Sequence, residues 1–268
     1  MSNDSTKKTI VVALGVCLVC SILVSTAAVS LHGIQEENKK TDKVKNILIA
    51  GNLFEDSVDV TKIFDEKIQA EILNLKTGEF LPKDEYGDNL DPEKFDIKAM
   101  AKDPQYGTSI PGDADIAQIH RMPLYVPVYK VYEKDQITKY ILPIYGKGLW
   151  STLYGFIALD KDLVTIKGIT FYEHGETPGL GGEVDNPRWK QTWVGKKAFD
   201  GQWNVRIEVI KGKVDPSNKN AIYQIDGLSG STLTTRGVDH LVRFWLGQNG
   251  YAPFFSKLRE EGSIYSAH

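Results

Sequence analysis

Cysteine is almost absent from this chain. Only Cys17 and Cys20 occur among 268 residues, and both lie within an apolar run near the N-terminus. The chain after residue 20 can therefore form no disulfide framework and no cysteine-based metal site. An iron–sulfur centre needs more thiolates than this chain provides, so partner chains would have to supply ligands. Histidine is also scarce, and its five positions are too scattered for a zinc motif: His32, His120, His174, His240 and His268.

The chain also lacks an excess of positive charge. After residue 31 it has 30 Lys and Arg against 34 Asp and Glu. The basic residues do not cluster into a patch that could follow the phosphates of a nucleic acid. No internal repeat or low-complexity tract is present. This composition argues against binding of DNA or RNA and is typical of an ordinary globular domain.

One long apolar run stands apart from this composition. Residues 9–31, a run of 23, carry no charge, follow two lysines and precede a strongly polar stretch. That length is enough to cross a bilayer once. The small residues Ala28 and Ser30 also fit the cleavage site of a signal peptide, but so long an apolar core favours a retained anchor. We expect an N-terminal segment at 1–8 and a single transmembrane helix at 9–31.

The rest of the chain predicts an α+β fold. We place an anchor-proximal α/β part at 32–120 and a second part at 121–268. A helix-like run occupies residues 60–68, and the stretch at 77–115 is rich in Pro, Gly and Asp, which predicts an irregular connection. From about residue 121 strands dominate, which favours an antiparallel sheet with packed helices. The strand-like runs lie at residues 124–132, 140–144, 155–159 and 164–171.

The most informative stretch is the polar turn at residues 226–234, Asp-Gly-Leu-Ser-Gly-Ser-Thr-Leu-Thr. Asp-Gly and Ser-Gly favour turns, and from Val238 apolar residues recur with helical spacing up to about Gly247 or Gly250. The turn therefore lies at a helix N-terminus, where free N–H groups and the helix dipole favour an anion. An ordinary capped helix explains the same residues. A serine hydrolase is disfavoured, because the Gly-x-Ser-x-Gly elbow needs glycine where Ser231 stands.

Two further segments combine glycine with loop or aromatic residues. Residues 174–183, His-Gly-Glu-Thr-Pro-Gly-Leu-Gly-Gly-Glu, follow a predicted strand and cannot form regular structure. Their glycines do not match the dinucleotide pattern Gly-x-Gly-x-x-Gly. Residues 145–155 place glycines beside a strand rich in aromatic residues, which suits a flat cofactor. Aromatic strand residues usually belong to the core, and this is the alternative for Trp150.

The turn at 226–234 resembles the flavinylation motif Asp-x-x-Ser-Gly-Ala-Thr of a known family, the FMN-binding subunits of the sodium-translocating NADH:quinone reductase and the related Rnf complex. In that family the last threonine carries FMN through a phosphoester bond, which implies covalent FMN on Thr232. Ser231 replaces the usual alanine, so Ser231 and Thr234 remain alternative acceptors. No base adjoins Thr232 in sequence, which implies that a flavin transferase supplies the chemistry and reads Asp226. The resemblance also places Ser229, Gly230 and Leu233 in the cofactor site.

The same resemblance extends beyond this turn. Glu-Thr-Pro-Gly-Leu-Gly at 176–181 is similar to the family loop that embraces the isoalloxazine ring. This implies that Leu180 covers the ring, while Glu176 and Thr177 offer polar contacts. Trp150 is a further candidate contact. Lys211 occupies the position of a family lysine near the flavin, although a solvated turn explains Lys211 equally well.

Across the whole chain, the three segments and the single anchor resemble the C subunit of the reductase more than the shorter Rnf homologue. The resemblance implies a relay of single electrons through FMN, with other membrane subunits as partners. No dinucleotide motif is present, so we expect no NADH site. Family members hold this domain outside the bacterial inner membrane, although the flanking lysines, two before the apolar run and four after it, point inward. An exported binding module without redox activity is the alternative from another class.

Overall fold

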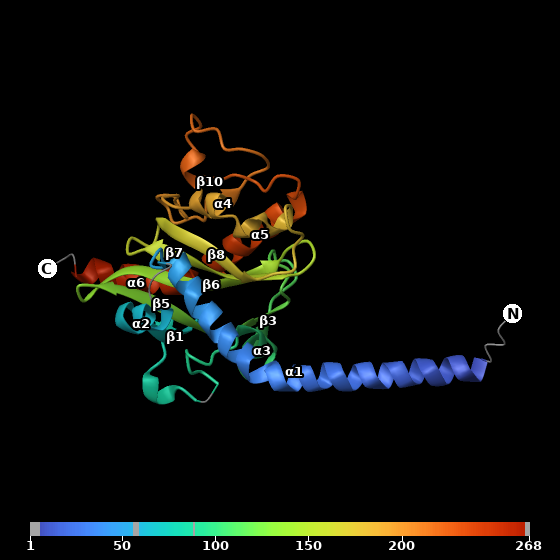
Figure 1. The fold of residues 1–268 in the computed structure, drawn as a ribbon. Coiled ribbons are helices and arrows are strands. Elements are labelled where there is room, and N and C mark those ends of the chain that lie inside the picture. Colours follow the sequence, from blue (N-terminus) through green and yellow to red (C-terminus); the bar gives the residue numbers. More distant parts are fainter. Residues whose placement is uncertain (1–5, 56–58, 88, 266–268) are drawn as a thin grey trace. The chain divides into compact units, whose positions relative to one another are not determined.

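The computed structural model describes residues 6–55, 59–87 and 89–265. Residues 1–5, which begin the segment expected at 1–8, lie outside these ranges. The chain separates into two compact units between Lys43 and Val44. Figure 1 shows a long N-terminal helix and a mixed unit of strands and helices. The boundary expected at residue 120 lies within the second unit.

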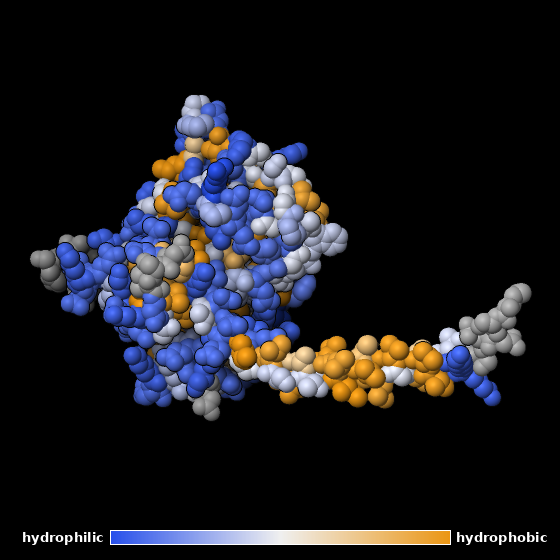
Figure 2. Space-filling view, in the orientation of Figure 1, coloured by the Kyte–Doolittle hydropathy of each residue, from blue (hydrophilic) through white to orange (hydrophobic). Residues whose placement is uncertain are grey.

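Helix α1, Thr6–Ala50, is longer than the predicted anchor. It continues past residue 31 because residues 35–45 are mostly Gln, Glu and Lys, which favour helix, and contain neither Gly nor Pro. The part at 9–31 rises about 35 Å, enough for a hydrocarbon core of about 30 Å. Its apolar side chains are exposed and line the helix in Figure 2. Helix α1 is thus long and apolar enough to cross a membrane.

A six-stranded sheet organises the second unit. Its strands lie in the order β2-β1-β5-β6-β7-β8, and every neighbouring pair is antiparallel. The α+β expectation with an antiparallel sheet is confirmed. Strand β1 escaped prediction from sequence, yet it pairs with β5 along its whole length. The strands are β1 Ile68–Asn74, β2 Glu79–Phe80, β5 Tyr125–Glu133, β6 Gln136–Lys147, β7 Thr152–Asp160 and β8 Ile166–Glu173.

Helices cover both faces of this sheet. On one face α5, Thr232–Leu246, and α6, Ala252–Tyr265, form a large apolar core with the strands. On the other face the last residues of α1 and helix α2, Val60–Lys67, form a second core. Successive strand residues alternate between the two cores, as the pleat requires. Ile141 of β6 belongs to the second core and Leu142 to the first.

The remaining elements are short. The stretch at 77–115, predicted to be irregular, holds β2 and several brief elements, and helix α6 was not predicted from sequence. The short helices are α3 Ile97–Lys102 and α4 Pro187–Gln191, with 3-10 turns η1 Lys83–Glu85, η2 Gly181–Asp185 and η3 Ala221–Tyr223. The short strands are β3 Gly107–Ser109, β4 Arg121–Pro123, β9 Glu208–Val209 and β10 Gln224–Ile225.

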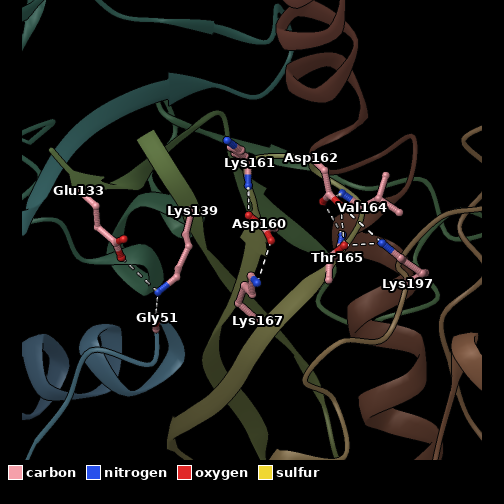
Figure 3. Close-up of polar contacts among 10 residues, drawn as sticks. All are labelled: Gly51, Glu133, Lys139, Asp160, Lys161, Asp162, Val164, Thr165, Lys167 and Lys197. Carbon is pink, nitrogen blue, oxygen red and sulfur yellow. Dashed lines mark hydrogen bonds and ion pairs between the residues drawn. The ribbon is translucent and has the colours of Figure 1, made fainter. Parts of the chain in front are cut away.

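Side-chain contacts fasten the end of α1 and the β7–β8 turn to the sheet (Figure 3). Lys139 on β6 donates to the carbonyl of Gly51 at 2.9 Å, so a positive charge meets the C-terminal end of α1. Burial, partly offset by Glu133, lowers the pKa of Lys139. In the β7–β8 turn, the Asp162 carboxylate accepts the backbone N–H of Thr165 at 2.7 Å. These contacts hold the end of α1 and the turn between β7 and β8, three elements that contribute to the second core or border it.

Two buried tyrosines provide a matched test of hydrogen bonding in the core. The hydroxyl of Tyr129 has no hydrogen-bond partner within the described part of the chain, whereas that of Tyr251 donates to the carbonyl of Pro143 at 2.7 Å. We expect Tyr129→Phe to raise the free energy of unfolding by about 1 kcal/mol and Tyr251→Phe to lower it by about 1 to 2 kcal/mol. Urea denaturation measures both. Equal destabilisation by the two variants would contradict this assignment.

The end of α1 belongs to the core of the second unit, since Ile47 and Leu48 are fully buried. A chain that begins at Val44 should therefore fold, whereas one that begins at Leu53 should lose about 3 to 6 kcal/mol of burial free energy. Thermal and urea unfolding of the two truncated proteins give the comparison. Identical unfolding midpoints would show that residues 44–52 are dispensable.

Candidate functional site

Three segments far apart in sequence surround a cavity of about 350 Å³. They are the turn at 148–151 after β6, the loop at 174–185 after β8, and the turn at 226–231 that leads into α5. Leu149 and Gly181 line the cavity although sequence reasoning did not single them out as contacts. The predicted site residues in the lining are Trp150, Glu176, Thr177, Leu180, Gly230, Ser231, Thr232, Leu233 and Thr234.

The carboxylate of Glu176 joins these segments. Its Oε1 accepts the backbone N–H groups of Trp150 at 2.9 Å and Ser151 at 3.2 Å. Its Oε2 accepts the N–H of Leu149 at 3.3 Å and the hydroxyl of Thr234 at 2.5 Å. Glu176 is 5% exposed. One carboxylate therefore holds the 148–151 turn, its own loop and the first turn of α5 together.

The charge state of Glu176 follows from these contacts. Burial raises the pKa of Glu176. The hydrogen bonds from Thr234 and from the three backbone N–H groups lower it by more than burial raises it, so the pKa lies below its ordinary value. The side chain is ionised at neutral pH and its oxygens are engaged by the protein. In the structure Glu176 lines the cavity and shapes its walls, and the expected polar contact with a cofactor stays a prediction.

The three hydroxyl groups at the start of α5 have different environments. Ser231 is 6% exposed and donates to Thr234 at 2.8 Å, and Thr234 is fully buried and donates to Glu176. The side chain of Thr232 is exposed at the cavity. Residues two apart on a helix point about 200° apart, so Thr232 and Thr234 face opposite sides. Of these three hydroxyls, that of Thr232 is the accessible one.

Helix α5 begins at Thr232, within the turn that was predicted to lie at a helix N-terminus, and ends at Leu246 with Gly247 after it. Within the described residues no side chain caps its N-terminus, so the first N–H groups are available to an anion. Gly230 has a φ of +72°, which glycine adopts without strain. A Cβ at Gly230 would lie 2.9 Å from Leu180 Cδ2, so a side chain here would press against the opposite loop.

Exposed apolar side chains surround the same cavity. Trp150 is 67% exposed and is therefore no core residue, contrary to the alternative that the aromatic strand allowed. Leu149, Leu180 and Leu233 are exposed as well and line the cavity with it. A group of exposed apolar residues around a hollow is typical of a site that holds a ligand or a partner.

Three predicted site residues are absent from the cavity lining, which lies wholly in the described part of the chain. Ser229 and Lys211 are exposed. Asp226 binds within the protein, where its carboxylate pairs with Lys213 and accepts the N–H of Val214, each at 2.8 Å. Burial raises the pKa of Asp226, but the contacts with Lys213 and Val214 lower it by more. The pKa therefore lies below its ordinary value and the carboxylate is ionised.

Curated relatives match this chain over almost its whole length. A Pseudomonas aeruginosa protein named as the C subunit of Na(+)-translocating NADH-quinone reductase is 46% identical over 262 residues, which cover 97% of this chain and 98% of the relative. A Yersinia pestis protein of the same name is 43% identical, with 97% and 95% covered. The chain belongs to the C subunits of the Na(+)-translocating NADH-quinone reductase. It is thus one component of an oxidoreductase complex.

Solved structures agree with membership of the C-subunit family. The crystal structure of Shewanella oneidensis NqrC matches with a TM-score of 0.74 and 33% identity, covering 83% of this chain and 99% of that one. The corresponding protein from Parabacteroides distasonis matches with a TM-score of 0.61 and 30% identity, covering 84% and 97%. The FMN-binding domain family matches residues 148–247. That range begins at the 148–151 turn and ends just after α5, so it contains all three cavity segments.

The contacts of Glu176 generate a pH-dependent prediction. In Glu176→Gln an NH₂ group replaces one acceptor oxygen, so we expect the free energy of unfolding at pH 7 to fall by about 2 kcal/mol. The pKa of Glu176 in the folded protein lies below its unfolded value of about 4.3. The extra stability of the parent protein is therefore fully present above about pH 4.3, and it is lost as pH falls through the pKa of the folded protein. Urea denaturation at pH 7 and pH 3 should therefore show a gap that narrows in acid.

The exposed ion pair between Glu79 and Lys257 supplies the control. Glu79→Gln should change stability by less than about 1 kcal/mol at either pH, because exposed pairs contribute little. A gap between the parent and Glu176→Gln that is equal at both pH values would contradict an ionised, hydrogen-bonded Glu176.

Proposed function

We propose that this protein carries FMN in a phosphoester bond to Thr232 and relays single electrons within the reductase complex. The observation that supports this most strongly is the difference among the neighbouring hydroxyls. Thr232 is exposed at the cavity and at the N-terminus of α5, whereas Ser231 and Thr234 are buried and hydrogen-bonded. Those two residues are the alternative acceptors that the sequence leaves open.

The residues around the cavity suit FMN. The phosphate would be held by the free N–H groups of the first turn of α5, close to Thr232. The apolar side chains of Leu180, Leu233 and Trp150 would contact the flat ring, with the hydroxyl of Thr177 as a polar neighbour. When bound, FMN supplies the ability to take up and pass on one electron at a time, and the protein positions and shields it.

Attachment of FMN requires an external enzyme. Thr232 Oγ1 forms the new bond to the flavin phosphate as a phosphoanhydride bond of the donor nucleotide breaks. The hydroxyl proton passes to a base of a flavin transferase. The other nucleotide of the donor leaves as a monophosphate that keeps the bridging anhydride oxygen. A threonine hydroxyl is a weak nucleophile without such a base. In the chain, His240 lies eight residues further on in α5, about two helical turns away.

The apolar helix α1 and the names of the relatives support a membrane location for this protein. The relatives are subunits of a quinone reductase, and α1 is suited to cross a membrane. We place the protein in the bacterial inner membrane with a single span, other membrane subunits as partners, and the FMN-bearing domain on the outer side. Covalent attachment would prevent loss of the cofactor in a compartment without a pool of free FMN.

Mass measurement tests the attachment directly. We expect the denatured full-length chain, produced together with an exported flavin transferase, to gain one FMN less one water on the peptide that contains Thr232. Thr232→Val should lack this mass and keep its fold, since it removes one hydroxyl at nearly constant volume. Ser231→Ala is the matched control and should keep the FMN. Covalent FMN on Thr232→Val, or an unmodified parent chain, would contradict the proposal.

A further inference from the structure

The carboxylate of Asp226 contacts the neighbouring segment at 213–214 and is absent from the cavity lining. Its Oδ1 accepts the backbone N–H of Val214 at 2.8 Å, and its Oδ2 pairs with the Lys213 ammonium at 2.8 Å. Its side chain is 18% exposed. The carbonyl of Asp226 accepts the indole N–H of Trp189 at 2.8 Å. The first residue of the FMN-attachment motif is therefore held by the protein through both its side chain and its backbone.

The partner of Asp226 is a segment that runs beside the motif. The N–H of Ile210 donates to the carbonyl of Ile225 at 3.0 Å, and the N–H of Gly227 donates to the carbonyl of Gly212 at 2.8 Å. A Cβ at Gly227 would lie 2.3 Å from the carbonyl oxygen of Ile210, so the two backbones touch. The Asp226 contact with Val214 is the next one along, and residues 215–219 beyond it are exposed.

The same turn is fixed from its other side by α5. Thr235 Oγ1 accepts the N–H of Leu228 at 3.0 Å and donates to the carbonyl of Ser231 at 2.8 Å. The first residues of the turn, Asp226 and Gly227, are held by hydrogen bonds to the segment at 210–214. Thr232 follows this turn directly, so the direction of its hydroxyl depends on both supports.

We propose that Asp226 is a positioning residue of the FMN-attachment motif, which fastens the segment at 210–214 against the turn that presents Thr232, and is not a group that the flavin transferase contacts. The inference rests on the proposed attachment at Thr232. It replaces the expectation that the transferase reads the Asp226 side chain.

The two contacts of the Asp226 carboxylate differ in weight. The side chain of Lys213 is 86% exposed, and ion pairs with so exposed a partner contribute little. The bond from the Val214 N–H is a charge-assisted hydrogen bond to a largely buried carboxylate, which is the stronger kind. Val214 is therefore the partner whose loss should matter, and Lys213 the partner whose loss should be tolerated.

The test compares variants on both sides of this contact in the full-length chain made with the transferase. The readout is the rate at which covalent FMN appears in the denatured protein. We expect Asp226→Ala and Val214→Pro each to slow attachment about tenfold, since either leaves a partly buried hydrogen-bonding group without its partner. Asp226→Asn should keep most of the rate, because its amide oxygen still accepts the Val214 N–H. Lys213→Met should retain at least half.

A double variant separates positioning from recognition. If Asp226 acts through Val214, Asp226→Ala with Val214→Pro should be no slower than the slower single variant. If the transferase contacts the carboxylate, Asp226→Asn should be as slow as Asp226→Ala, Val214→Pro should approach the parent rate, and the proposal fails.

Amide hydrogen exchange at Val214 reports directly on the Asp226–Val214 hydrogen bond. It needs neither FMN attachment nor a folded Val214→Pro variant. Exchange at Val214 should be faster in Asp226→Ala than in Asp226→Asn, with similar thermal unfolding midpoints. Unchanged exchange in Asp226→Ala would overturn the positioning role even if Val214→Pro failed to fold. An unmodified parent chain would contradict the attachment at Thr232 while the exchange result still decided the role of Asp226.

Discussion

The cavity depends on one buried negative charge that is surrounded by hydrogen-bond donors. The carboxylate of Glu176 accepts three backbone N–H groups from the turn at 149–151 and a hydroxyl from α5. An ionised carboxylate is costly to bury, and it is stable here because the donors replace the water that it loses. Gly148 and Gly181 allow this approach, since a Cβ at either position would lie less than 3 Å from a Glu176 oxygen. Three segments distant in sequence thereby become the walls of a single site.

This arrangement also distinguishes among neighbouring hydroxyl groups of similar chemistry. The chain of hydrogen bonds from Ser231 through Thr234 to Glu176 directs two of them inward. All three residues line the cavity, but only Thr232 has an exposed side chain there. Thr232 therefore differs from Ser231 and Thr234 in accessibility, because the fold has already engaged the other two hydroxyls.

The end of the long helix and the cavity are connected through the sheet. Residues 44–50 of α1 pack into the second core, on the face of the sheet opposite to α5. Strand β6 contributes Ile141 to this core and Leu142 to the core beneath α5, and it ends at Lys147, where the cavity begins. The strand that supports the end of α1 therefore also carries one wall of the site.

The sequence by itself determined the features that depend on local pattern. These are the long apolar run, most strands of the antiparallel sheet, the start of a helix at the turn of residues 226–234, and the loops that line the cavity. Each of them is encoded by neighbouring residues through periodicity, turn propensity or a motif. Strand β1 was missed because its limits are set by pairing with β5. The extension of α1 over residues 32–50 was missed although its Gln, Glu and Lys residues favour helix; only its end, at Ile47, Leu48 and Ala50, packs into a core.

Only the tertiary structure decided what the polar side chains do. Glu176 and Asp226 are both acidic residues within recognisable motifs, and their sequences offer no sign that both are engaged by distant backbone N–H groups. Trp150, for which a core position was the alternative, lies in the turn between β6 and β7 and is exposed at the cavity. Burial and hydrogen bonding between distant segments exist only after the chain has folded, and for that reason the residues of the site could be found from sequence but their roles could not.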